Sequence, residues 1–152
     1  MRQALGTFAT GVTVITARDQ GGRPVAMTVS SFTGVSLDPP LVLWCAQRDV
    51  GPFAAFAAAQ HFAVHVLHSD QGDEAMHFAQ DIEDKFAGAE PERGLADLPL
   101  LADCAACFQC TVERHIDAGD HLVFMGRVLA LDCRDAEPLV FHRGRLGGFS
   151  PA

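Results

Sequence analysis

The segment Ala26-Met-Thr-Val-Ser-Ser-Phe-Thr-Gly-Val-Ser-Leu-Asp-Pro-Pro40 differs from an ordinary β-strand region. A half-buried strand alternates large apolar and polar side chains, whereas small and hydroxyl-bearing residues predominate here. Small side chains leave the backbone amides accessible, and Ser or Thr hydroxyls add hydrogen-bond donors. The segment therefore suits the polar edge of a flat ring, although a twisted strand and turn without any ligand would account for the same residues.

The sequence on both sides of this segment predicts further strands and a few helices. Residues 12–17 are rich in β-branched side chains and predict a strand, which a Gly-rich turn over residues 19–24 ends. The continuous apolar run 41–46 predicts a central strand. Further strands are predicted over residues 33–37, 62–67, 105–115, 121–133 and 139–142, helices over 2–8, 53–60 and 69–80, and a surface excursion over 88–103. Ser69 is the predicted cap of the last helix.

The order of these elements favours a mainly β (α+β) fold. Strands do not alternate regularly with helices, which disfavours a doubly wound parallel sheet. A closed or partly closed antiparallel barrel with peripheral helices suits the pattern. The 152 residues contain no linker, repeat or low-complexity segment, so we expect one domain over residues 1–152.

Composition narrows the class of protein. The hydrophobic fraction of 49% and the charged fraction of 20% are those of a globular chain rather than a disordered one. No apolar run reaches the roughly 18 residues of a membrane helix, and the first residues lack the pattern of a signal peptide. We therefore expect a soluble cytoplasmic protein without a membrane partner. The net charge of -8 disfavours nucleic acid as a partner, because phosphate backbones repel an acidic surface.

Five cysteines raise the question of a metal site. The odd count disfavours a disulfide framework. Cys104, Cys107 and Cys110 would share a face on a helix, but residues 108–114 alternate as in a strand, where Cys104 and Cys110 would point one way and Cys107 the other. No second pair completes a four-ligand zinc set. The sequence therefore favours buried structural thiols and no metal.

Charged and titratable residues elsewhere give weaker signals. Residues 45–53 leave a buried strand and enter a helix, and a helix N-terminus with Arg48 nearby suits a phosphate, although a solvated loop is the alternative. Lys85 offers a second positive charge or a solvated one. His121 and His142 are candidates for proton donors or cofactor contacts, and a structural role is the alternative for each. No Gly-x-Gly-x-x-Gly or Walker motif is present.

Taken in order, several motifs resemble the flavin reductase-like family, the short-chain reductase components of two-component flavin monooxygenases. The first three are Leu5-Gly-Thr-Phe-Ala-Thr-Gly-Val-Thr-Val-Ile-Thr16, Ala26-Met-Thr-Val-Ser-Ser-Phe32 and Val35-Ser-Leu-Asp-Pro-Pro40. The later ones are Phe62-Ala-Val-His-Val-Leu67, Phe78-Ala79, Asp84-Lys-Phe86, Gly119-Asp-His121, Phe124-Met-Gly-Arg-Val128 and Pro138-Leu-Val-Phe-His-Arg-Gly144. The resemblance covers nearly the whole chain.

The resemblance implies an FMN-binding split β-barrel with peripheral helices, usually a homodimer with flavin at the subunit interface. It implies hydride transfer from NADH or NADPH to FMN or FAD, and delivery of diffusible reduced flavin to a flavin-dependent monooxygenase. The residues it assigns to the flavin are Ala26, Met27, Thr28, Val29, Ser30 and Ser31 at the isoalloxazine, Ala46, Gln47 and Arg48 toward the ribityl and phosphate, and Lys85 and Phe86 at the phosphate or adenylate end. It places His121 and His142 on the nicotinamide side.

One departure from the family pattern concerns the phosphate loop. The family usually has Ser or Thr where this chain has Asp49 and Val50, and Gly51 and Pro52 follow. We therefore expect phosphate binding to be weaker, or to depend more on Arg48 and on Lys85 and backbone amides.

Two other functions remain open at the level of sequence. A flavin carrier on the same fold would bind flavin tightly and oxidise little NAD(P)H. A metal-binding or redox-sensing protein would use the cysteine cluster. No residue pattern separates NADH from NADPH, or FMN from FAD, and the monooxygenase partner is not identified.

Overall fold

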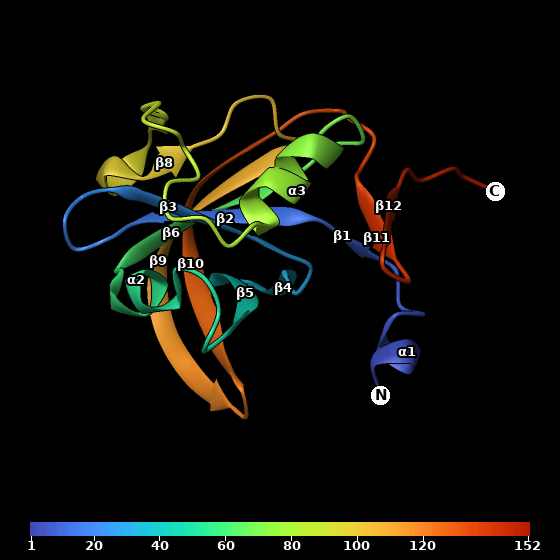
Figure 1. Ribbon diagram of the computed structural model, residues 1–152, viewed down its shortest axis with the longest axis horizontal. Helices are drawn as coiled ribbons and strands as arrows, with labels where there is room; N and C mark the ends of the chain where they lie inside the picture. The colour runs from blue at the N-terminus through green and yellow to red at the C-terminus, as the bar shows by residue number, and fades with distance from the viewer.

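Seven antiparallel strands form the main sheet of the computed structural model, which describes residues 1–152 (Figure 1). Their order across the sheet is β3-β2-β6-β9-β10-β5-β4. The strands are β2 (Thr13–Arg18), β3 (Pro24–Val29), β4 (Thr33–Leu37), β5 (Pro40–Gln47), β6 (His61–Val66), β9 (Ala106–Ala118) and β10 (His121–Cys133). Every neighbouring pair is antiparallel, which confirms the prediction of a mainly β fold without a doubly wound sheet.

Three short α-helices accompany the sheet, namely α1 (Arg2–Leu5), α2 (Phe53–Ala58) and α3 (Gly72–Ala79). The helix α3 lies against β3, where the Thr28 hydroxyl donates to the Ala75 carbonyl at 2.7 Å. It begins three residues later than predicted, and Ser69 is not its cap. The Ser69 amide instead donates to the Glu137 carbonyl, which holds this residue outside the helix. None of the helices has the length and apolar character needed to cross a membrane.

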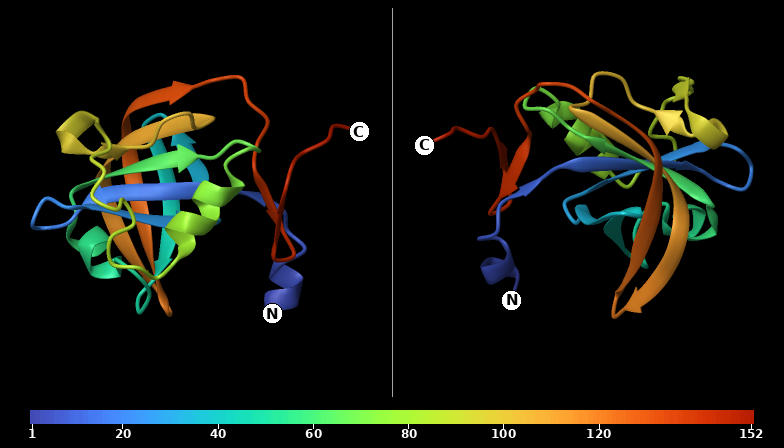
Figure 2. Two further views of the ribbon diagram at one scale, coloured as in Figure 1. Left: turned by 45° about the horizontal axis from the view of Figure 1, so that its top comes forward. Right: turned by 180° about the vertical axis from the view of Figure 1, so that it is seen from behind.

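The two ends of the chain meet in an arm beside the main sheet (Figures 1 and 2). Here β1 (Thr10–Gly11), β11 (Val140–His142) and β12 (Arg145–Gly147) form a three-stranded sheet in the order β1-β11-β12. The Arg143 amide also donates to the Gly6 carbonyl, which ties the arm to the segment after α1. The sequence predicted β11 but neither β1 nor β12, because runs of two or three residues show no periodicity.

The predicted surface excursion over 88–103 is only partly exposed. It contains β7 (Glu92–Arg93), the 3₁₀ helix η1 (Leu95–Asp97) and β8 (Pro99–Leu100). Leu98 is buried, and the Thr16 hydroxyl of β2 donates to the Pro99 carbonyl. The prediction was therefore wrong for residues 98–100, whose apolar side chains fill space beside β2.

Two apolar clusters lie on opposite faces of β2. Ile15 and Ala17 belong to the larger cluster, while Val14 belongs to the smaller one under α3. In the larger cluster, the Trp44 ring stacks on Phe124 with 4.2 Å between ring centroids. Since successive strand residues point to opposite faces, burial of both faces explains why β2 reads as a nearly continuous apolar run.

The cysteines lie in separate environments. Cys110 belongs to the larger cluster and Cys104 to the smaller one, so the prediction that both point the same way was wrong. Cys104 precedes β9, and the strand alternation does not extend to it. Burial raises the pKa of Cys107 and of Cys110 to about 12. No group of three or more His, Cys, Asp or Glu side chains is arranged to hold a metal ion.

Candidate functional site

A pocket of about 300 Å³ opens between β3, the end of β5 and the segment that follows α3. It gathers many of the residues that the sequence assigned to a ligand. Those residues are Met27, Thr28, Val29, Ser30, Ser31, Ala46, Gln47, Lys85 and His121. Its remaining lining residues are Cys45, Val50, Gly51, Pro52, Phe78, Ala79, Gln80 and Asp81. We call this cavity the ring pocket.

The wall formed by β3 offers backbone groups because β3 is an edge strand of the main sheet. Alternate N–H and C=O groups of an edge strand point away from its only neighbour and have no strand partner. The Ala26 carbonyl is one of them, since it accepts a hydrogen bond from Lys85 rather than from β2. By the same alternation, the backbone of Thr28 faces away from β2, toward the ring pocket that this residue lines.

The two serines after β3 have different roles. The Ser31 hydroxyl donates to the Cys45 carbonyl at 3.2 Å and accepts from the Cys45 amide at 2.9 Å. It therefore fastens the segment after β3 to β5. Ser30 is exposed and makes no such bond, so its hydroxyl is the one that a ligand in the ring pocket can use. The sequence did not distinguish these two residues.

Lys85 is buried, and its hydrogen bonds link two elements of the fold. Its ammonium donates to the Ala26 carbonyl and to the Phe78 carbonyl, each at 2.9 Å. Burial lowers the pKa of Lys85, and the nearby Asp81 carboxylate partly opposes that effect. The ammonium thus joins β3 to the end of α3, whereas the sequence predicted that it points at a phosphate.

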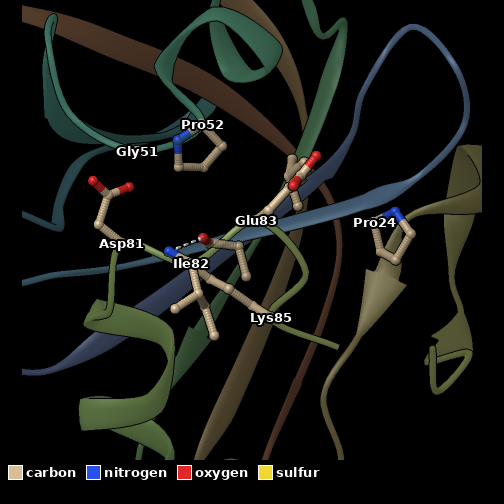
Figure 3. Close-up of a pocket in the computed structure, with 9 residues that line it drawn as sticks. Pro24, Gly51, Pro52, Asp81, Ile82, Glu83 and Lys85 are labelled. Carbon is tan, nitrogen blue, oxygen red and sulfur yellow. Dashed lines mark hydrogen bonds between the residues drawn. The ribbon is translucent and has the colours of Figure 1, made fainter. Parts of the chain in front are cut away.

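A second, adjoining pocket of about 280 Å³ continues the ring pocket past Lys85 (Figure 3). The two cavities share Gly51, Pro52, Asp81 and Lys85, and Ala26 lines only the second. Figure 3 shows the Asp81 and Glu83 side chains extending from the segment after α3 toward the side on which Pro52 lies. We call this second cavity the acidic extension.

Two residues assigned to the phosphate end lie elsewhere. The Arg48 guanidinium pairs with Asp117 and lies 5.9 Å from the Phe53 ring centroid, and Arg48 lines neither cavity. The hairpin between β9 and β10 attracts it, because that hairpin presents the carboxylate. Phe86 packs on Phe78 with ring centroids 5.5 Å apart and does not line the ring pocket either.

The two histidines singled out from the sequence lie on different sheets. His121 begins β10 and lines the ring pocket. Its Nδ1 is 2.7 Å from Asp120 Oδ1, which leaves Nε2 for a ligand, and this bond lowers the pKa of Asp120. His142 lies on β11 in the arm, is exposed, and does not line the ring pocket. The structure therefore does not bring the two histidines together.

A larger groove of about 960 Å³ between the arm and the main sheet meets the ring pocket at Ser30. Arg2 and Arg143 line it, and neither guanidinium has an ion pair within the chain. We call it the arginine groove. Sequence reasoning missed both arginines, because they are far apart in the chain and only the pairing of β1 with β11 brings their segments together.

The edge strand that lines a ring-sized pocket, beside a groove with two unpaired arginines, can accommodate a flat cofactor ring and its phosphates. The chain belongs to the flavin reductase-like family, since residues 5–150 match the family model described as flavin reductase like domain. Family membership was predicted from the ordered motifs, and this match confirms it.

Several characterised proteins are similar to the chain. The reductase subunit of a stachydrine N-demethylase from Rhizobium meliloti is 43% identical over 152 residues, which are 100% of this chain and 65% of that protein. FMN reductase (NADH) from Agrobacterium fabrum is 43% identical over 98% of this chain and 84% of its own length. The solved structure of an NADH:FAD oxidoreductase from Streptomyces globisporus, in complex with NAD and FAD fragments, has a TM-score of 0.91 and 38% identity over 99% of this chain and 91% of that one.

The chain is shorter than some of these relatives. It spans 65% of the Rhizobium meliloti subunit and 48% of a second relative from the same organism.

The residues present fit a flavin ring. The ring pocket has an edge strand whose spare amides and carbonyls match the polar edge of an isoalloxazine, one free hydroxyl at Ser30 and one free imidazole nitrogen at His121. They fit a phosphate poorly, since the acidic extension contributes two carboxylates and one ammonium that is already bonded to two carbonyls.

Proposed function

We propose that the protein is an NAD(P)H:flavin oxidoreductase that reduces FMN or FAD. The observation that supports this most is the ring pocket itself, in which the β3 edge and Ser30 lie with His121 around one cavity. We propose further that residues 1–152 work as one flavin reductase-like domain, and that the seven-stranded sheet is the split barrel of this family. Flavin, when bound, supplies the hydride-accepting ring.

The chain's own residues hold and orient the reactants. Backbone groups of β3 and the Ser30 hydroxyl would hold the polar edge of the isoalloxazine. His121 Nε2 would donate to or accept from a reactant over the ring, with its imidazole fixed by Asp120. Hydride transfer between stacked rings needs orientation more than a protein acid or base, so His121 and His142 would affect binding more than chemistry.

The arginine groove would receive the nicotinamide dinucleotide. Two unpaired guanidiniums suit a pyrophosphate, because Arg binds phosphate oxygens through charge-assisted hydrogen bonds. The groove meets the ring pocket at Ser30, so a dinucleotide bound there could place its nicotinamide over the flavin. His142 stands beside this groove next to Arg143, which keeps it on the nicotinamide side.

Partner and compartment follow from the same reading. The relatives named as reductase subunits support a flavin-dependent monooxygenase that takes up diffusible reduced flavin from this protein. Exposed apolar side chains outside the arginine groove, including Leu37 on β4 and Leu131 on β10, support a homodimer in which a second copy covers them. Five free cysteines suit the reducing cytoplasm, where NAD(P)H is also found.

The test is oxidation of NADH and NADPH, followed by absorbance, with purified protein and added FMN or FAD. Many turnovers per protein molecule would support the reductase. Tight flavin binding without turnover would establish the carrier instead, and absence of flavin binding would overturn the proposal. As a matched pair, Ser30→Ala should weaken flavin binding about fivefold, the loss of one hydrogen bond. Ser69→Ala, at an exposed position outside the pocket, should leave it unchanged.

A further inference from the structure

The ring pocket has an outlet for the flavin side chain, and its chemistry is opposite to that of a phosphate site. The ring pocket and the acidic extension share Gly51, Pro52, Asp81 and Lys85, so they form one continuous groove. The proposed function assigns the end of the ring pocket at Ser30 to the nicotinamide dinucleotide, so an isoalloxazine along the β3 edge would direct its ribityl chain and phosphate toward these four residues.

The only side-chain donor that this outlet leaves for a phosphate is the third hydrogen of the Lys85 ammonium. Its loop consists of Val50, Gly51 and Pro52, of which none has a polar side chain and the last has no N–H. The Arg48 guanidinium is turned away to Asp117. The Lys85 ammonium donates two of its three hydrogens to the carbonyls of Ala26 in β3 and Phe78 in α3.

The outlet also carries uncompensated negative charge. Asp81 and Glu83 are exposed and line the extension, and neither carboxylate has a hydrogen-bond or ion-pair partner within the chain. Lys85 is the only cation lining the groove, which leaves an excess of one negative charge. A phosphate dianion placed there is repelled, whereas an uncharged ribityl chain can hydrogen-bond to the carboxylates.

We propose that this site recognises flavins by the ring and ribityl chain and discriminates against the phosphate, with Asp81 and Glu83 as the discriminating residues. Riboflavin is then bound at least as tightly as FMN or FAD and reduced at least as fast. This inference deepens the proposed function and rests on it for the position of the ring. The Asp49 and Val50 departure in the phosphate loop and the two carbonyl hydrogen bonds of Lys85 both weaken phosphate binding.

Binding is measured first, because it does not depend on turnover. Riboflavin, FMN and FAD are titrated separately, with quenching of the single tryptophan, Trp44, as the signal. The expected result is a riboflavin Kd equal to or below the FMN Kd, and FMN binding that tightens with added salt while riboflavin binding does not change. FMN binding tenfold or more tighter than riboflavin, weakened by salt, would overturn the inference.

Charge-neutral variants identify the residues. Glu83→Gln, alone and together with Asp81→Asn, should tighten FMN binding about tenfold in the double variant and leave riboflavin within twofold. Glu92→Gln on the exposed strand β7, outside the groove, is the matched control and should change neither. An unchanged FMN to riboflavin ratio in the double variant would exclude these carboxylates as the cause.

Turnover is measured afterwards with NADH and each flavin. Flavins that bind in the expected order but are not reduced would refute the proposed function and leave the charge discrimination standing. Rapid reduction of FMN with slow reduction of riboflavin would refute the discrimination and support the reductase.

Discussion

Substitution of Lys85 by methionine should destabilise the fold without removing a phosphate contact. The ammonium is buried and makes two hydrogen bonds of 2.9 Å, to the Ala26 and Phe78 carbonyls. A hydrogen bond to a charged group contributes about 1.5–3 kcal/mol, and its deletion leaves a carbonyl unsatisfied. Methionine fills most of the volume and relieves the cost of burying a charge, which offsets part of the loss. We expect a net loss of about 2–3 kcal/mol in the free energy of unfolding.

The assay is urea unfolding followed by the fluorescence of Trp44, which is the only tryptophan and is fully buried. The midpoint should shift while the slope of the transition is unchanged. Arg134→Met is the control, because its half-exposed ion pair with Asp103 at 3.3 Å should contribute no more than about 0.5 kcal/mol. Because Lys85 is the only cation lining the groove, its loss should lower FMN affinity relative to riboflavin by about threefold, a charge effect that needs no direct phosphate contact.

The opposite outcome would be equally clear. A Lys85→Met protein as stable as wild type, with FMN binding weakened tenfold and riboflavin binding intact, would mean that the ammonium serves a phosphate. The two carbonyl hydrogen bonds would then not be the main role of Lys85.

Three other substitutions test the core and the arginine groove. Burial lowers the pKa of His65 from 6.5 to about 4, so between these pH values the unfolded chain binds more protons than the folded chain. The free energy of unfolding should therefore fall by about 3 kcal/mol as the pH falls from 6.5 to 4. Urea unfolding of wild type and of His65→Gln over this range measures the effect, and an equal fall in both proteins would exclude it. A Cβ at Gly126 would lie 2.4 Å from the Phe62 ring, so Gly126→Ala should lower the free energy of unfolding by about 1–3 kcal/mol in the same assay. Gly34→Ala is the control, because a Cβ there meets nothing within 4 Å, and it should not lower the free energy of unfolding. Equal effects of the two substitutions would contradict the packing. Arg143→Gln should raise the KM for NADH several-fold with flavin affinity unchanged. Arg145→Gln, outside the groove, should alter neither quantity. An unchanged KM in Arg143→Gln would mean that Arg143 does not bind the nicotinamide dinucleotide.

The strands could be predicted because their signals are local. The apolar run that became β5 and the β-branched run that became β2 were both recognised, and both lie within a residue or two of their predicted bounds. The arm could not be predicted, since β1 and β12 exist only because they pair with β11. A strand of two residues has no periodicity of its own.

The ring pocket was predicted as a set of residues but not as a set of roles. Ser30 and Ser31 are identical in the sequence, and only the distance to Cys45 shows that Ser31 is already bonded. Lys85 lines the pocket, but the direction of its ammonium depends on two carbonyls from distant elements. Side-chain direction is a tertiary property, and the residue type does not encode it.

Lys85 is also the only lysine in the sequence, and it is buried in the folded protein. A lysine-specific endoproteinase therefore has a single cleavage position, between Lys85 and Phe86, and cannot reach it while β3 and α3 stay joined. Cleavage into two fragments at that position would report how often this one contact opens, since proteolysis of a closed site follows the population of its open form. A ligand seated in the ring pocket should slow the cut, which makes the rate of digestion a measure of occupancy that requires neither light absorption nor turnover.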